Sequence, residues 1–193
     1  IGNSVTSIGN SAFYGCSGLT SVIWNAENCT SAGSSEYPIF SNCSKLTNVT
    51  IGKNVKIIPD YAFSGCSDLT SVTIPNSVAS IGSSAFSSCI GLTSVTIGNS
   101  ITSIGNSAFI GCSELASVTI GNAVTSIGDS AFYNCSGLTS VNYLGAIDQW
   151  VEINFSNNYA NPLFYAKKLY INNDLVTEVN LTTATKISSY AFY

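Results

Sequence analysis

Residues 69–91 read LTSVTIPNSVASIGSSAFSSCIG, and residues 92–114 read LTSVTIGNSITSIGNSAFIGCSE. The two stretches are identical at 15 of 23 positions, and residues 115–137 continue in the same frame. A fixed period of this length is typical of solenoids, in which each repeat is one supersecondary unit that stacks on the next. The sequence therefore predicts a stack of similar coils.

The first half of each repeat predicts a strand. In residues 92–114 the apolar positions follow the pattern L-x-x-V-x-I-x-x-x-V-x-x-I-x-x-x-A-F-x-x-C, and most positions between them carry Ser, Thr, Asn or Gly. Val95 and Ile97 alternate with Thr96, which favours a strand with one buried face and places the threonine toward solvent. A turn at residues 98–100 is expected to follow.

The second half of each repeat predicts a second extended piece, at residues 101–104, and then one helical turn over residues 107–112. Asn106 or Ser107 is a suitable N-cap, because either side chain can accept a hydrogen bond from a free backbone N–H. Each coil is thus expected to contain a strand, a turn, an extended piece, a short helix and a return.

The pattern resembles the BspA-like leucine-rich repeat proteins of bacteria. The resemblance implies an α/β repeat solenoid, coiled in a right-handed sense, with a parallel β-sheet on its concave face and short helical turns opposite. It also implies a secreted or cell-surface protein, often an adhesin, and it transfers no catalytic residue because the family shares no catalytic site. The motifs that carry it are the L-x-x-V runs at Leu19, Leu46, Leu69, Leu92, Leu115 and Leu138, the S-I-G segments at Ser80, Ser103 and Ser126, and the A-F-x-x-C segments at Ala62, Ala85, Ala108 and Ala131.

The repeats predict one domain over residues 1–193. The chain starts and stops inside a repeat, so we expect a fragment of a longer array. The expected units are a partial repeat at 1–18, repeats at 19–45, 46–68, 69–91, 92–114 and 115–137, a long variant repeat at 138–168, and a hairpin with a partial repeat at 169–193.

Two units depart from the regular frame. The repeat at 19–45 carries a four-residue insertion, and its segment 28–38 reads as a surface loop, with Cys29 as a small buried side chain. In the long repeat, residues 146–151 predict a short helix, and Asn161 with Pro162 predicts the start of another. Residues 169–171 and 175–181 predict a hairpin whose second strand rejoins the array.

Composition excludes several classes of function. The 193 residues are 45% hydrophobic and 8% charged, with a net charge of −4 and six positive residues, all lysine. A nucleic-acid-binding protein needs a basic stripe, which this chain lacks. The longest apolar runs are far shorter than the roughly 18 residues of a membrane span. The chain has no histidine, which excludes Ser-His and Cys-His nucleophile pairs.

The cysteines are expected to be buried free thiols. Stacked coils would hold adjacent side chains about 4.8 Å apart, which is beyond the usual Cβ separation of a disulfide. One ligand per coil also cannot converge on zinc, so we expect no cofactor and no metal. The predicted core ladder consists of Cys16, Cys43, Cys66, Cys89, Cys112 and Cys135 with Phe63, Phe86, Phe109 and Phe132.

Two groups of residues are candidates for binding. One is a ladder of threonines on the exposed sheet, which Asn142 and Asn180 would extend, although solvent-facing threonine is also simply what a strand prefers. The other is the set of aromatic residues in the long repeat, most of which should form its local core while any exposed ones would be hot spots for a partner. The candidate residues are Thr50, Thr73, Thr96, Thr119, Trp150 and Tyr159.

The carboxylates Asp148 and Glu152 stand four residues apart beside Trp150. Such a pair could serve glycosidase chemistry, but a helix of fewer than two turns offers no pocket, so a solvated helix face is the preferred interpretation. An enzyme is therefore the weakest of the functional hypotheses.

The preferred function is a non-catalytic, extracellular, adhesin-like module that binds a host or microbial protein or glycan. A stiff structural spacer that displays another domain is the alternative, and a threonine-ladder binder of ice or another ordered surface is a third possibility. End-to-end self-association is also expected, because the open ends expose strand edges and apolar core.

Overall fold

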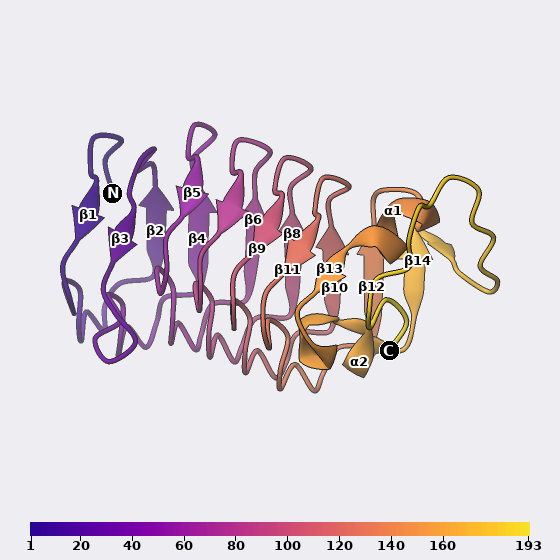
Figure 1. Cartoon of the computed structure of the whole chain (residues 1–193). Coiled ribbons are helices and arrows are strands. Elements are labelled where there is room, and N and C mark those ends of the chain that lie inside the picture. Colours follow the sequence, from indigo (N-terminus) through magenta and orange to yellow (C-terminus); the bar gives the residue numbers. More distant parts are fainter.

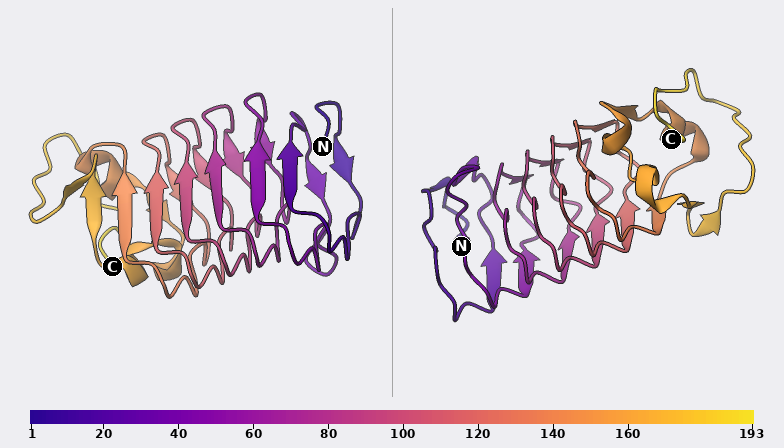
Figure 2. Two further views of the ribbon diagram at one scale, coloured as in Figure 1. Left: turned by 180° about the vertical axis from the view of Figure 1, so that it is seen from behind. Right: turned by 90° about the horizontal axis from the view of Figure 1, so that it is seen from below.

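The computed structural model describes all 193 residues as one solenoid (Figure 1). Successive coils are stacked side by side, so that each makes its main contacts with the coil before it and the coil after it. A sheet of long strands lies on one side of the stack and rows of short strands lie on the other (Figure 2). The long variant repeat and the C-terminal segment lie at one end.

The main sheet has eight strands in the order β15-β14-β12-β10-β8-β6-β4-β2. All its pairs are parallel except β14 with β15, as expected when every coil returns to the same starting point. Its strands are β2 (Ser21–Trp24), β4 (Asn48–Ile51), β6 (Ser71–Ile74), β8 (Ser94–Ile97), β10 (Ser117–Ile120), β12 (Ser140–Tyr143), β14 (Leu169–Ile171) and β15 (Asp174–Leu175).

The short strands form two further parallel ladders on the opposite side. One has five strands in the order β13-β11-β9-β7-β5, and the other pairs β1 with β3. They are β1 (Ser7–Ile8), β3 (Ser31–Ala32), β5 (Ile57–Ile58), β7 (Ser80–Ile81), β9 (Ser103–Ile104), β11 (Ser126–Ile127) and β13 (Asn154–Phe155). The second extended piece predicted for each repeat is therefore present.

The helical turn predicted for each regular repeat does not form. Ser107 has a positive φ of 54°, which interrupts a right-handed helix before it starts. The Phe109 N–H donates to the Ala131 carbonyl of the next coil at 2.9 Å, and the same bond joins Phe86 to Ala108 at 2.8 Å. The A-F-x-x-C segment is a series of turns. Its phenylalanine N–H groups donate to carbonyls of the next coil and are therefore not available for hydrogen bonds within a helix.

The expected N-cap also has a different partner. Asn106 Oδ1 accepts a hydrogen bond from the backbone N–H of Asp129, in the next coil, at 2.8 Å. Asparagines at the turn after the main strand do the same. Asn76 Oδ1 accepts from the Asn99 N–H at 2.8 Å, and Asn99 Oδ1 accepts from the Asn122 N–H at 3.3 Å. These asparagines therefore join coils to each other.

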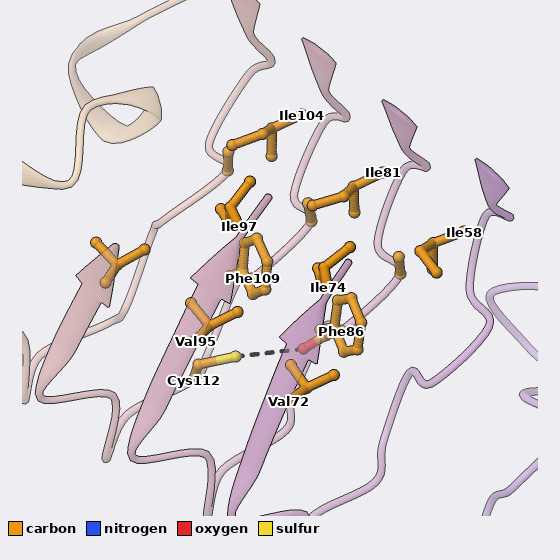
Figure 3. Packing of buried hydrophobic residues seen from close by; sticks show 14 of the residues in the cluster. Ile58, Val72, Ile74, Ile81, Phe86, Val95, Ile97, Ile104, Phe109 and Cys112 are labelled. Carbon is orange, nitrogen blue, oxygen red and sulfur yellow. Dashed lines mark hydrogen bonds between the residues drawn. The ribbon is translucent and has the colours of Figure 1, made fainter. Parts of the chain in front are cut away.

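The core is one continuous cluster between the two sides of the stack (Figure 3). Phe63, Phe86, Phe109 and Phe132 are fully buried and stack in a row, with centroids 5.3, 5.3 and 5.4 Å apart. Phe40 and Phe13 extend the row toward the N-terminus. One ring per coil thus gives the array a shared aromatic column.

Helices occur only in the long variant repeat, as α1 (Ile147–Glu152), the 3₁₀ helix η1 (Asn158–Ala160) and α2 (Leu163–Ala166). Helix α1 lies within one residue of its predicted range. Asn161 Oδ1 accepts the Leu163 N–H at 2.9 Å, which is the capping role predicted for this asparagine at the start of α2.

Two predictions about the variant units are wrong. Segment 28–38 is not all surface loop, because β3 lies within it and Ala32 is buried, whereas Cys29 is buried as predicted. The second hairpin strand ends at Leu175, not at residue 181, and it runs antiparallel to β14 without starting a new coil. Residues 176–190 instead extend beyond the sheet as irregular chain (Figure 2).

Candidate functional site

The outer surface of the eight-stranded sheet, here called the sheet face, carries the predicted threonine ladder. The register places Thr73 opposite Thr96, and Thr96 opposite Thr119. Thr50 lies opposite Ile23 of β2. Thr50, Thr73 and Thr96 are exposed and Thr119 is half-buried. No other segment of the chain lies in front of this face (Figure 2).

The ladder ends differently from the prediction. Asn142 continues it, but the next residue in register is Tyr170 of β14. Asn180 is exposed in the irregular segment and does not join the sheet. The reason is that the hairpin reverses the chain at residues 172–173, so residue 180 never returns to the strand position.

A second column of threonines was missed by the sequence analysis. The hydroxyls of Thr70, Thr93 and Thr139 each donate to the carbonyl of the equivalent residue in the preceding coil, at 3.4, 3.1 and 3.0 Å. These threonines occupy the position after the repeat leucine. Their recurrence at that position was the available signal, and their role is to join coils.

Trp150 is not available to a ligand. Its side chain is fully buried and packs against Tyr143 and Phe155, with ring centroids 5.5 and 5.4 Å away. Its Nε1 donates to the Ala191 carbonyl at 2.8 Å, so both its apolar body and its polar atom are occupied. The prediction that Trp150 contacts a partner is therefore wrong, and the residue forms the core of the long repeat.

Tyr159 belongs to a group of partly exposed rings at the C-terminal end, here called the aromatic cluster. Tyr159 packs edge-to-face on Tyr133 at 4.7 Å and on Phe164 at 4.8 Å. The ring centroids of Tyr165 and Phe164 are 4.8 Å apart, and Tyr193 stacks on Phe164 with centroids 5.5 Å apart. The cluster thus joins rings from the last regular repeat, the long repeat and the C-terminus. Its members are Tyr133, Tyr159, Phe164, Tyr165 and Tyr193.

An apolar pocket of about 360 Å³ borders this cluster. Leu163, Leu169 and Val176 form part of its wall, and Tyr193 belongs to both the pocket and the cluster. Lys167 also lines it and holds its ammonium 5.3 Å from the centroid of the Phe164 ring. A concave apolar surface with few polar groups is the usual form of a binding site.

Asp148 and Glu152 do not form a solvated helix face, because both side chains bond to the C-terminal segment. Asp148 Oδ1 accepts the backbone N–H groups of Thr182, Thr183 and Ala184 at 2.8, 2.6 and 2.7 Å. These bonds lower the pKa of the Asp148 carboxyl below its ordinary value, and bonds from Thr185 do the same for the pKa of Glu152. Both side chains fasten the C-terminal segment to α1.

The cysteines form the predicted ladder, with one exception. The Cys112 thiol donates to the Phe86 carbonyl of the preceding coil at 3.2 Å (Figure 3). The Cys89 thiol makes the equivalent bond to the Phe63 carbonyl at 3.1 Å. Burial raises the pKa of the Cys66 thiol well above its ordinary value and that of Cys89 to about 12. Cys16, in the first coil, is exposed. All seven thiols are free.

The coils define the class of protein. Each coil contributes one strand to a continuous parallel sheet and one ring to a shared column. This arrangement is that of a leucine-rich-repeat solenoid. A family model described as the BspA type leucine rich repeat region, in six copies, matches residues 1–37 and 34–161. The chain belongs to this family. Solenoids of this class are typically non-catalytic and interact with proteins, and no helix of the chain is long and apolar enough to cross a membrane.

Solved bacterial structures share the fold. A leucine-rich repeat protein of Bacteroides ovatus is 30% identical, with a TM-score of 0.58, and the match covers 78% of this chain and 40% of that one. A leucine-rich repeat protein of T. pallidum is 28% identical, with a TM-score of 0.51, over 72% of this chain and 52% of that one. The pneumococcal vaccine antigen PcpA is 19% identical, with a TM-score of 0.52, over 84% and 42% of the two chains, and it shows the fold alone.

This chain therefore spans about half or less of the length of these proteins. No curated protein matches it.

Proposed function

We propose that the chain is an extracellular, adhesin-like interaction module that binds a host or microbial protein or glycan through the aromatic cluster and the pocket beside it. The observation that carries this proposal is the packing of partly exposed rings from three segments into one surface cluster. The position of Tyr133 carries Tyr14 in the first repeat but Ser64, Ser87 and Ile110 in the three preceding ones, so stacking of coils does not require a tyrosine there. Exposed, amphipathic tyrosines are also enriched at the centres of protein interfaces.

The proposal extends to where the protein works. Family membership and the relation to bacterial leucine-rich repeat proteins support a secreted or cell-surface location. The uncharged, hydroxyl-rich sheet face, which the family resemblance places on the concave side, is the second candidate surface. On a flat array the same threonines would suit the recognition of ice or another ordered surface.

The test is saturable binding to a panel of immobilised extracellular-matrix proteins and glycans, measured by surface plasmon resonance. Replacing Tyr133 and Tyr193 by alanine should weaken binding by about tenfold or more, because hot-spot side chains each contribute more than about 1 kcal/mol. Tyr37→Ala is the matched control, since Tyr37 is 51% exposed and belongs to the repeat at residues 19–45, several coils away from the cluster. The double substitution Thr73→Glu/Thr96→Glu probes the sheet face.

Loss of binding in the tyrosine variant alone supports the aromatic cluster, and loss in the threonine variant alone moves the site to the sheet face. Absence of binding to any member of the panel contradicts the module and favours a spacer. The observation that favours a spacer is the uniformity of the central coils, where β6 and β8 have the same sequence, SVTI, and the same alternating burial.

We also propose that copies of the chain associate end to end. Phe13 and Leu19 are only partly buried in the first coil, and Phe192 at the other end is 45% exposed. When the first coil of one copy binds the C-terminal end of another, each assembly still has one free end of each kind. The size of the assemblies should therefore grow with protein concentration. Static light scattering should show a rising mass, and a constant monomer mass at high concentration would contradict this proposal.

A further inference from the structure

Residues 182–193, here called the strap, are held on the long repeat by unusually dense polar contacts. One carboxylate oxygen of Asp148 accepts three consecutive backbone N–H groups, from residues 182–184. One oxygen of Glu152 accepts both the N–H and the hydroxyl of Thr185, at 2.5 and 2.8 Å. Asp148 and Glu152 stand one turn apart on α1, so both carboxylates face the same segment.

The remaining contacts of the strap depend on this attachment. The Ser188 N–H donates to the Val151 carbonyl at 2.7 Å, and Asn161 Nδ2 donates to the Tyr190 carbonyl at 2.6 Å. The Ala191 carbonyl accepts the indole N–H of Trp150. Between β15 and residue 182 the chain has no secondary structure, so the strap is tethered on its N-terminal side only by irregular chain.

These contacts are strongest with ionised carboxylates. Hydrogen bonds to an ionised carboxylate are charge-assisted, whereas a protonated carboxyl is a weaker acceptor and carries an O–H that needs an acceptor of its own. We propose that Asp148 and Glu152 form an acid-sensitive latch: ionised, they fasten the strap to α1, and protonation releases it and uncovers Trp150 and Asn161.

No other carboxylate faces these two groups. Lys186 is the charged residue beside Glu152, and it favours the ionised form of that side chain. Tyr143 lines the same hollow as Glu152, but burial raises its pKa to about 12, so it does not titrate in acid. The folded state lowers the pKa of both carboxyls below their ordinary values of 3.8 and 4.5. The latch is therefore closed at neutral pH and opens as the pH falls through the lowered values.

Opening has a consequence for the proposed binding surface. The strap supplies Phe192 and Tyr193 to the wall of the apolar pocket, and Tyr193 to the aromatic cluster. Release removes these side chains from Leu163 and Phe164 and dismantles one side of the site. This coupling rests on the proposed function, whereas the opening of the strap does not.

Hydrogen exchange measured by mass spectrometry tests the latch without any ligand. At neutral pH, Asp148→Asn/Glu152→Gln should lower the protection factors of residues 182–193 by about tenfold or more and leave residues 92–114 unchanged. Asp174→Asn is the matched control, because Asp174 is an exposed carboxylate on β15. Wild-type protein should approach the exchange pattern of the double variant as the pH is lowered through and below the ordinary values of 3.8 and 4.5.

Trp150 provides a second readout. In a Trp24→Phe background it is the one remaining tryptophan, and its emission should shift to longer wavelength when the strap opens and water reaches the ring. An unchanged protection factor and emission in the double variant would overturn the proposal. So would equal loss of protection in residues 92–114, which would mean global unfolding in place of a local latch.

If a ligand is found for the aromatic cluster, the double variant should bind it more weakly than the Asp174→Asn control. A missing ligand leaves the exchange and emission results interpretable, so failure of the proposed function and failure of the latch are distinguishable.

Discussion

At the residue scale, the aromatic column supplies one fully buried ring to each regular coil. Phe109 is fully buried and lies between Phe86 and Phe132, at 5.3 and 5.4 Å. Phe109→Ala should lower the free energy of unfolding by about 3–5 kcal/mol, because it removes transfer energy and leaves a cavity between two coils.

Urea unfolding followed by circular dichroism measures this loss. Ile90→Ala is the control, since Ile90 is 48% exposed, and it should change stability by less than about 0.5 kcal/mol. A similar effect of the two substitutions would mean that the column does not stabilise the array.

The thiols differ in reactivity because only the thiolate reacts. Cys16 is exposed, whereas the other six thiols are buried away from the reagent, and burial raises the pKa of the Cys89 thiol to about 12. Ellman's reagent should therefore modify one thiol rapidly in the native protein, and all seven after denaturation. Cys16→Ser should abolish the rapid phase. Two or more rapid thiols in the native protein would contradict the buried ladder.

The same thiols predict alkaline destabilisation. A pKa that is higher in the folded state than in the unfolded state stabilises the fold fully below the unfolded value, which is 9.0 for cysteine. This contribution is lost as the pH rises from 9.0 toward about 12, the folded value of Cys89. The urea midpoint should fall across this range, and it should fall less steeply in Cys89→Ala, which removes the titrating group.

Burial of a side chain was predictable where the repeat period determines whether that side chain points into the core. Phe63 and Cys89 are inward because the period places them there, and the structure buries both. Trp150 was misjudged because the long repeat has no regular frame, and its burial depends on a carbonyl 41 residues away. The hydrogen-bond partners of Asp148 could not be predicted either, because they lie at residues 182–184, far along the chain and outside the regular repeats.

At the scale of elements, the strands follow from the local sequence and the turns do not. Alternating Val and Ile determine which face of β8 is buried, and the structure agrees. The A-F-x-x-C segment has helix-compatible residues, but its N–H groups find carbonyls in the next coil. A pattern read within one repeat cannot reveal that competition, because the acceptors belong to the neighbouring repeat.

The spacing of coils also constrains glycine. A Cβ on Gly121 would overlap the carbonyl oxygen of Gly98 in the preceding coil, well inside van der Waals contact. Gly121→Ala should therefore push two coils apart and destabilise the protein by about 1–3 kcal/mol, in the range of overpacked cores. Gly18→Ala is the control, because no atom lies within 4 Å of its Cβ position. Thermal unfolding of both variants measures the difference, and equal midpoints would contradict so close an approach.

At the scale of the whole molecule, the array is nearly one-dimensional. Strand β8 pairs with β6 and β10, and this pattern repeats along the sheet. The free energy of unfolding of such a stack is close to the sum of a contribution from each repeat and a contribution from each interface between neighbouring repeats. The repeat period alone was therefore enough to predict the architecture, whereas the curved or straight course of the stack depends on small rotations between coils that no single repeat encodes.

This one-dimensional coupling predicts a gradient of local stability. Residues 92–114 have coils on both sides, and they exchange backbone bonds with each, as in Thr93 N–H to Thr70 and Ala116 N–H to Thr93. Residues 1–18 have a neighbour on one side only. In residues 176–181 only Val176 donates a backbone bond to another backbone group.

Hydrogen exchange at neutral pH should therefore be slowest in residues 92–114, faster in residues 1–18 and fastest in residues 176–181. Phe109→Ala should accelerate exchange most in its own coil and the two adjacent ones, because it weakens both of their interfaces. Uniform exchange along the wild-type chain would mean that all coils open together. In that case the coils would form a single cooperative unit, and the loss caused by Phe109→Ala would spread evenly over the array.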